Sequence, residues 1–298
     1  NTVETAERTL GEVEVGARLS VRLTQLWKSL WQPLEGHLDS SLPIDIAPVG
    51  MLHAVPWATL RQRDGQFLCQ IFDATLYIIK DTLIRFQKQA AGQNVLACGT
   101  SSAPGSLALQ GEFPFDDHLA KLVSQLTALP GVQSELAIFT SPTLENPTRQ
   151  KFLESMSQPP GTLHLAGHGF VIESSEGNGF RAGLIFHGGG AENILFARDI
   201  AKLDLSGTEL VVLSACRGGI GQSEVSGNWS SLRRSFIAAG ARQVMAAQWQ
   251  VRDDQIPGFM RRFYQLRQSH SAPLALWKLQ QEWIQKGTDL DLASAGAW

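Results

Sequence analysis

Two apolar segments that each carry one reactive side chain limit what this chain can fold into. One runs from His164 to Gly169 and contains His168, and the other runs from Leu210 to Cys216. Cys216 follows His168 by 48 positions (216 − 168), which leaves room for one crossover between parallel strands. If both segments are buried parallel strands, the two side chains meet at the carboxyl edge of the sheet, where open α/β sheets bind ligands.

Composition excludes several classes of protein. The chain has 298 residues, of which 43% are hydrophobic and 18% charged, as in ordinary globular proteins. A net charge of −3 offers no basic surface for nucleic acid or for an anionic membrane, so neither is expected as a direct partner. No apolar run reaches the roughly 18 residues of a spanning helix, and the first residues do not resemble a signal peptide. We therefore expect a cytoplasmic protein.

The three cysteines, Cys69, Cys98 and Cys216, are odd in number and widely spaced. This spacing argues against a disulfide framework and fits a reducing compartment. The chain starts at Asn1 without a Met and ends at Trp298 without a stop signal, so we expect a piece of a longer protein.

Apolar patterning predicts alternating helices and strands. The leucine spacing from Leu19 to Leu34 predicts an amphipathic helix. Besides the two segments above, strands are expected at 44–49, 74–79, 95–98, 136–139, 184–187 and 244–249, and helices at 115–128, 147–156, 197–203, 230–239 and in two stretches between 256 and 284. Such alternation predicts an α/β fold with a mostly parallel sheet flanked by helices. The Ser-, Gly- and Pro-rich loop at 100–105 is the expected domain boundary, which gives domains 1–105 and 106–298.

The chemistry that His168 and Cys216 could perform is nucleophilic catalysis. Only a thiolate attacks, and a free cysteine has a pKa of about 8.5, so Cys216 needs a base such as His168. The backbone N–H groups of Gly169 and Cys216 could bind the oxyanion that forms. The alternative is a structural one, with Cys216 as a core cysteine and His168 satisfied by a carbonyl group.

Five segments, in order, resemble the CHAT-domain proteases, relatives of caspases and separase. The His-Gly and Ala-Cys segments resemble the two catalytic signatures of this family, and residues 46–60 resemble its early "P-x-G-x-L-x-x-x-P-[FW]-x-x-L" stretch. Residues 183–186 with 199–200 resemble the part between His and Cys, and residues 236–254 resemble "F-x-x-A-G-A-R … W-x-V-x-D".

This resemblance implies a caspase-like fold, in which 1–105 is a pseudo-caspase half and 106–298 the catalytic half. It implies a cysteine endopeptidase with a His168–Cys216 dyad and no cofactor, switched on by an upstream sensor or helical-repeat module. It also implies that Asp253 contacts the substrate side chain before the cleaved bond. Trp249, Asp254 and Arg217 are further expected to bind substrate. The alternative is a catalytically silent scaffold that binds a protein partner through the same cleft.

Two positions depart from the family pattern. Arg217 follows the cysteine where the family commonly has an acid, and residues 226–229 replace a Gly-Glu-Gly region. The first departure affects local electrostatics and the second the activation loop, and neither involves the dyad. Asp253 and Asp254 could instead be acids that cap a helix.

Other sites are less consistent with the sequence. His164 and His168 would lie about 13 Å apart on one strand, too far for one zinc ion, and no other metal site is expected. Gly188-Gly189-Gly190 lacks the Lys that a phosphate-binding loop requires and is expected to form a hairpin turn. The chain lacks the G-x-S-x-G elbow of an α/β-hydrolase.

Overall fold

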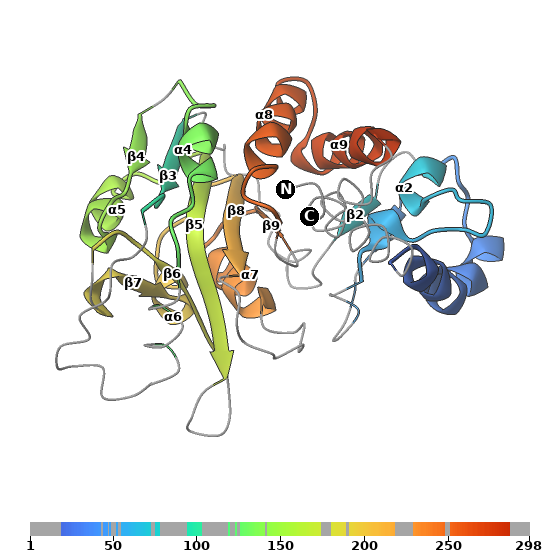
Figure 1. The fold of residues 1–298 in the computed structure, drawn as a ribbon, viewed down its shortest axis with the longest axis horizontal. Coiled ribbons are helices and arrows are strands. Elements are labelled where there is room, and N and C mark those ends of the chain that lie inside the picture. The colour runs from blue at the N-terminus through green and yellow to red at the C-terminus, as the bar shows by residue number, and fades with distance from the viewer. Residues whose placement is uncertain are drawn as a thin grey trace, which may run out of the picture. The chain divides into compact units, whose positions relative to one another are not determined.

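The fold is that of a computed structural model (Figure 1), which describes residues 19–42, 44–46, 48, 52, 55–72, 75–77, 94–102, 119, 123, 126–140, 142–173, 180–188, 191–217, 229–247 and 251–286. Within these ranges only the backbone is described at residues 45, 75–77, 172–173, 180–181, 191, 215–217 and 229–231. The chain forms two compact units. We call residues 1–48, 55–79 and 262–298 the first unit, and residues 49–54 and 80–261 the sheet unit.

The sheet unit contains a seven-stranded sheet in which the long strand β5 (Thr162–Glu173) is central. Five strands are parallel, in the order β4 (Thr143–Glu145), β3 (Val95–Gly99), β5, β8 (Leu210–Arg217) and β9 (Gln243–Ala246). Two antiparallel strands, β6 (Phe180–Ile185) and β7 (Ile194–Phe196), complete it. The prediction of an α/β fold with a mostly parallel sheet, consistent with a caspase-like fold, is confirmed.

Strand β5 changes its neighbour at Gly167. Residues 162–166 pair with β3, and residues 168–173 pair with β6 on the same edge, while β8 pairs with 162–169 on the other edge. Gly167 has a φ of 147°, which L side chains rarely adopt, and the Thr100 N–H donates to the carbonyl of Ala166 where β3 ends. Glycine at 167 therefore lets the strand change partners directly before His168.

The two faces of the sheet are covered differently. One face is apolar and packs against α5 (Arg149–Ser155), α6 (Ala197–Ile200) and α7 (Trp229–Ala238), through side chains such as Leu163, Leu165, Phe152 and Phe236. The other face packs against the short helix α4 (Gly131–Leu136), which Figure 1 shows in front of the sheet. Leu163 and Leu165 alternate with His164 along β5, because successive strand residues point to opposite faces.

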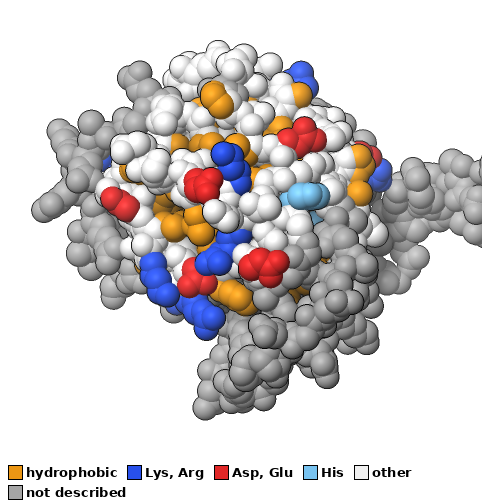
Figure 2. Space-filling model, turned by 90° about the vertical axis from the view of Figure 1, so that its left-hand side faces the viewer, with side chains coloured by type: hydrophobic (Ala, Val, Ile, Leu, Met, Phe, Trp, Pro, Cys, Tyr) orange, Lys and Arg blue, Asp and Glu red, His pale blue; other side chains and the backbone are white. Residues whose placement is uncertain are grey.

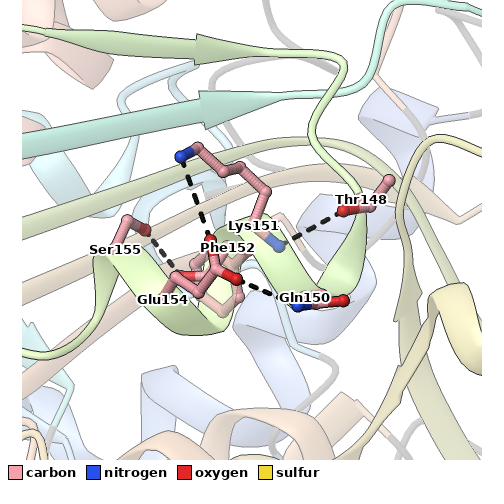
Figure 3. Close-up of polar contacts among 6 residues, drawn as sticks. All are labelled: Thr148, Gln150, Lys151, Phe152, Glu154 and Ser155. Atoms are coloured by element: carbon pink, nitrogen blue, oxygen red, sulfur yellow. Dashed lines mark hydrogen bonds and ion pairs between the residues drawn. The ribbon is translucent and has the colours of Figure 1, made fainter.

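Helix α5 follows a sequence-encoded N-cap (Figure 3). The Oγ1 atom of Thr148 accepts a hydrogen bond from the Lys151 N–H at 3.2 Å. On the exposed side of the helix, Lys151 and Gln150 both contact Glu154, while Phe152 is fully buried. The buried Phe152 and the Thr148 cap are consistent with the helix that the sequence predicts here.

The strand predicted at residues 136–139 is wrong. Leu136 ends helix α4, and the strand of this region is β4, at Thr143–Glu145. Val132, Glu135 and Leu136 are buried, at the i, i+3 and i+4 spacing of a helix, while Gln133 and Ser134 are exposed. The apolar run resembles a strand in sequence because the preceding helical turn has a buried Glu where an apolar residue is usual.

Most other predicted elements are confirmed with shifted bounds. Strands β1 (Ile44–Ile46) and β2 (Thr75–Tyr77) form a parallel pair, and β3, β9, α5, α6 and α7 lie where strands and helices were expected. The strand expected at 184–187 is β6, which begins earlier, at Phe180. Residues 119 and 123 are helical, whereas most of the helix predicted at 115–128 lies outside the described residues. The Gly-rich segments 174–179 and 218–227 also lie outside the described residues.

The first unit is built around aromatic side chains. Residues 19–26 are helical and continue into η1 (Trp27–Trp31) and η2 (Gln32–His37). The Trp31 ring lies 6.1 Å from that of Trp27, 6.4 Å from that of Trp57 and 5.6 Å from that of Phe72. The other helices in the described ranges are η4 (Trp57–Thr59), α2 (Leu68–Ile71), η5 (Ala191–Asn193) in the sheet unit, α8 (Ile256–Arg267), whose first six residues belong to the sheet unit, and α9 (Ala272–Lys286).

The division into units differs from the boundary predicted at residue 105. Strand β3 precedes that boundary but pairs with β4 and β5 in the sheet unit, and residues 262–298 belong to the first unit. Composition could locate the loop after β3 but not the backbone hydrogen bonds that join β3 to distant strands. That residues 1–105 form a pseudo-caspase half and residues 106–298 the catalytic half stays a prediction.

Acidic and basic side chains are interspersed on the face seen in Figure 2, with hydrophobic surface between them. Among the helices that the structure describes, none is long and apolar enough to cross a membrane.

Candidate active site

The sheet brings residues 168 and 216 side by side. His168 on β5 and Cys216 on β8 are partners in the parallel register, and neighbouring strands lie about 4.8 Å apart. The backbone thus has the adjacency that the sequence predicts. The side chain of Cys216 lies outside those that the structure describes.

The ring of His168 is held by a backbone carbonyl. Its Nε2 atom lies 2.9 Å from the carbonyl oxygen of Thr127, and its side chain is buried. A carbonyl oxygen only accepts, so Nε2 carries the proton of this hydrogen bond, and in the neutral ring Nδ1 keeps a free lone pair. In this form Nδ1 is the ring nitrogen that can accept a proton.

Burial lowers the pKa of His168 below its ordinary value of 6.5. The hydrogen bond to Thr127 and the negative charge of Asp253 act in the opposite direction, because both favour the protonated ring. The neutral form, which can accept a proton, thus predominates near pH 7.

Asp253 lies in this neighbourhood, as its electrostatic effect on His168 requires. Its Oδ2 atom accepts a hydrogen bond of 2.7 Å from the N–H of Gly131, at the start of α4. A Cβ atom at residue 131 would lie 2.3 Å from the backbone oxygen of Asp253, so the approach requires glycine. The carboxylate of Asp253 thus binds the N-terminus of α4, whereas the helix that follows Asp253 in the chain is α8.

Thr127 lies in the loop that leads into α4, and Gly131 is the first residue of this helix. We call residues 126–131 the 126–131 loop, which connects His168 with Asp253. The Leu129 N–H in this loop also donates to the carbonyl of Ser101, just beyond β3, at 2.8 Å. The 126–131 loop is therefore fixed to β5, to the end of β3 and to the segment before α8. No sequence pattern indicates Thr127, because its contribution is a backbone carbonyl that any residue could supply.

The other predicted site residues are distributed as follows. Gly169 lies inside β5 rather than after its end, with Leu184 on one side and Arg217 on the other. Its role in an oxyanion hole stays a prediction, as does the role of Arg217, of which only the backbone is described. Asp254 is exposed and forms two hydrogen bonds with Arg252, at 3.0 and 2.7 Å. Trp249 lies outside the described residues.

His164, the other histidine of the segment, takes part in a second contact on the same face of β5. Its Nε2 atom lies 3.0 Å from Oε1 of Glu135 on α4, and both side chains are buried. His164 and His168 thus have separate partners. Among the residues that the structure describes, no group of three or more His, Cys, Asp or Glu side chains could hold a metal ion.

A cavity of about 20 Å³ borders His168 between β3, β5 and β6. It has room for one water molecule at most, so it is not a cleft for a peptide. Cys98 lines this cavity, and burial raises the pKa of its thiol to about 12. Burial raises the pKa of Cys69 to about 12 as well. Neither cysteine forms an appreciable amount of thiolate near neutral pH.

Comparison with known proteins agrees with the sequence motifs and with this geometry. The CHAT domain family matches residues 21–294, a range that includes both His168 and Cys216. No curated protein matches the chain. CHAT domains form a family of caspase-like cysteine peptidases. Because this match covers nearly the whole chain, the protein belongs to the CHAT domain family.

Proposed function

We propose that this CHAT domain is a cysteine endopeptidase, with Cys216 as the nucleophile and His168 as the general base. The observation that carries the proposal is the register of β5 and β8, which makes these two positions direct neighbours. The contact between His168 and the Thr127 carbonyl supports it, because a ring protonated at Nε2 has Nδ1 available to accept a thiol proton.

The proposed reaction has two halves. Nδ1 of His168 takes the proton of Cys216, and the sulfur attacks the carbonyl carbon of the substrate peptide bond. The N–H groups of Gly169 and Cys216 bind the oxygen as it becomes negative. The C–N bond then breaks, and His168 gives its proton to the departing amine. Water hydrolyses the resulting thioester in the same way and regenerates the thiol.

Substrate selection is assigned to Asp253, with Trp249, Asp254 and Arg217 as further contacts. A carboxylate near the dyad would favour a basic residue before the cleaved bond, because Arg pairs with it in a bidentate manner. The electrostatic effect of Asp253 on His168 supports its closeness to the dyad. Its hydrogen bond to Gly131 allows a second role, in which Asp253 fixes the 126–131 loop instead of contacting substrate.

Activity is proposed to depend on a regulator, such as a sensor or a helical-repeat module in the cytoplasm. The motive is the sequence of the segments that flank the site, 173–181 and 218–227, both rich in glycine. Contacts of the regulator with these segments would complete the substrate groove. Strong cleavage of unfolded proteins by this chain alone would contradict this part of the proposal.

The function is tested by mapping new protein termini in a proteome incubated with the wild type or with the Cys216→Ala variant. Termini produced by the wild type alone support the peptidase. Identical termini with both proteins, in an extract that contains the regulator, contradict it. A peptide electrophile separates the peptidase from a silent scaffold, because a scaffold need not react at Cys216. Absence of both new termini and a Cys216 adduct would favour the scaffold.

A further inference from the structure

The contact between His164 and Glu135 is the most buried ionisable pair that the structure describes in the sheet unit. The exposed fractions of the two side chains are 0% and 1%, and Nε2 lies 3.0 Å from Oε1. The two atoms have the distance of an ion pair but not the alignment of a hydrogen bond. The ring of Phe139, just after α4, packs 5.0 Å from the ring of His164.

Stability alone does not explain such a pair. Removing two ionisable groups from water costs about as much as their attraction returns, and apolar replacements are often as stable or more stable. Buried polar pairs can instead fix one arrangement of two elements, because any other arrangement leaves a polar group unpaired. The elements joined here are β5, which carries His168, and α4, which follows the loop that contacts His168.

Helix α4 depends on such contacts for its position. It has six residues, and isolated helices shorter than about 12 residues are unstable in water. Val132 and Leu136 pack on Ala97 and Ala166. A Cβ atom at Gly99 would lie 2.6 Å from Val132, so the helix sits close against β3.

The segment from Thr127 to Glu135 crosses the face of β5 in the antiparallel direction. Thr127 contacts His168 at one end, and Glu135 contacts His164 at the other. The two histidines are four residues apart, about 13 Å along the strand. Movement of α4 along β5 would therefore carry the Thr127 carbonyl away from the His168 ring.

We propose that Glu135 and His164 are positioning residues, which fix α4 on β5 and so hold the Thr127 carbonyl where it orients His168. This inference rests on the proposed role of His168 as the base. Neither residue touches the reacting atoms. Their effect reaches the base through the 126–131 loop, whose other end is held by Asp253.

Three variants test this role. Glu135→Gln keeps an oxygen acceptor of the same size beside His164. Glu135→Leu combined with His164→Leu removes the polar pair but leaves apolar side chains that are expected to allow folding. Glu154→Leu is the matched control, because it removes a carboxylate from a surface ion pair with a distance of 3.9 Å and exposed fractions of 64% and 54%.

The first readout does not depend on proteolysis. Nitrogen-15 NMR of His168 in a Cys216→Ala background, at about pH 8 where the ring is neutral, reports which ring nitrogen carries the proton. Wild type, Glu135→Gln and Glu154→Leu should show the Nε2–H form. The double Leu variant should show a mixture of both forms. A folded double variant with the wild-type spectrum would overturn the proposal.

The second readout uses the intact Cys216. The double Leu variant should lower kcat by about 10- to 100-fold with KM nearly unchanged, because a displaced base affects the chemical step. Glu135→Gln should retain activity, and so should Glu154→Leu. An unchanged kcat in the double variant contradicts positioning while the peptidase proposal stands. If neither the wild type nor any variant cleaves a peptide, the NMR result still decides the positioning role, and only the proposed function fails.

Discussion

The two faces of β5 differ in the side chains they carry. Leu163 and Leu165 point into an apolar core with Phe152 and Phe236, whereas His164 and His168 lie on the face that packs against α4 and the 126–131 loop. The apolar face contributes stability through buried area, which requires no particular angle between groups. On the other face, the Thr127 carbonyl and Glu135 contact the two histidine rings at 2.9 and 3.0 Å. Because successive side chains of β5 point to opposite faces, the same strand contributes apolar residues to the core and histidines to the candidate site.

The largest expected effect is the loss of proteolysis when the dyad is removed. His168→Ala and Cys216→Ala should each lower kcat/KM by about 10⁴-fold or more, and the double variant should lose little more, because the pair acts as a unit. Thermal unfolding of either single variant should stay near wild type. A single variant with wild-type turnover would show that the dyad is wrongly assigned.

Truncation of a side chain that packs on the apolar face of β5 should lower stability and leave catalysis unchanged. Phe152→Ala removes a fully buried ring and should lower the free energy of unfolding by about 3–5 kcal/mol, as measured by urea denaturation. Activity per folded molecule should not change. If Phe152→Ala lowered kcat and left stability unchanged, the two faces of β5 would not have separate roles.

Asp253→Ala distinguishes the two roles of this carboxylate. If it pairs with a basic substrate residue, the variant should lose about 2–5 kcal/mol of transition-state binding for Arg substrates, tens to thousands of times in kcat/KM. Leu substrates should change little. If the carboxylate only fixes Gly131, peptides with Arg and Leu should be affected equally. An unchanged ranking in a library that varies this one position excludes the pocket role.

Acid should weaken the fold through His168. Burial lowers the pKa of its ring in the folded state, so the unfolded chain binds more protons from the ordinary pKa of about 6.5 downward. Stability contributed by the neutral ring is therefore present above about pH 6.5 and lost as the pH falls toward the lower, folded value. Urea denaturation gives the free energy of unfolding at about pH 7 and at about pH 5. The difference between these two values should be smaller for His168→Gln than for wild type. An equal difference would argue that His168 is not buried as neutral imidazole.

The smallest effect is expected at the N-cap of α5. Thr148→Ala removes the acceptor for the Lys151 N–H and should lower the free energy of unfolding by about 1 kcal/mol, without effect on catalysis. Glu154→Ala on the same helix is the control and should change it by less than about 0.5 kcal/mol, because its partner Lys151 is exposed. Equal losses in both variants would mean that the cap contributes nothing specific.

The placement of His168 beside Cys216 was predictable because both lie in apolar runs whose spacing fits one crossover. That β5 continues beyond His168 to Glu173 was not predicted. Periodicity also identified α5, which has a cap and a buried Phe152. It failed at Leu136, since a helix of six residues with a buried Glu135 has too short a pattern to differ from a strand. Had this helix been recognised, a Glu between Val132 and Leu136 on its buried face would have indicated a buried partner.

Other parts of the site could not be predicted from sequence patterns. The Thr127 contact uses a main-chain oxygen, which no side-chain pattern reveals. The contact of Asp253 with Gly131 joins residues that are 122 positions apart in the chain, and it depends on packing of α4 against the segment before α8. The sequence shows a glycine at residue 167. Only the register of the sheet shows that β5 changes its neighbour from β3 to β6 at this residue.

The central claim, that His168 activates Cys216, is tested most directly by alkylation with iodoacetamide near pH 7. This small reagent needs neither a substrate groove nor a regulator, and the other two cysteines are buried with pKa values of about 12. Mass spectrometry should find the first adduct at Cys216 in the wild type, formed about tenfold or more faster than in His168→Ala. Equal rates in the two proteins, or earlier modification of Cys69 or Cys98, would contradict the claim.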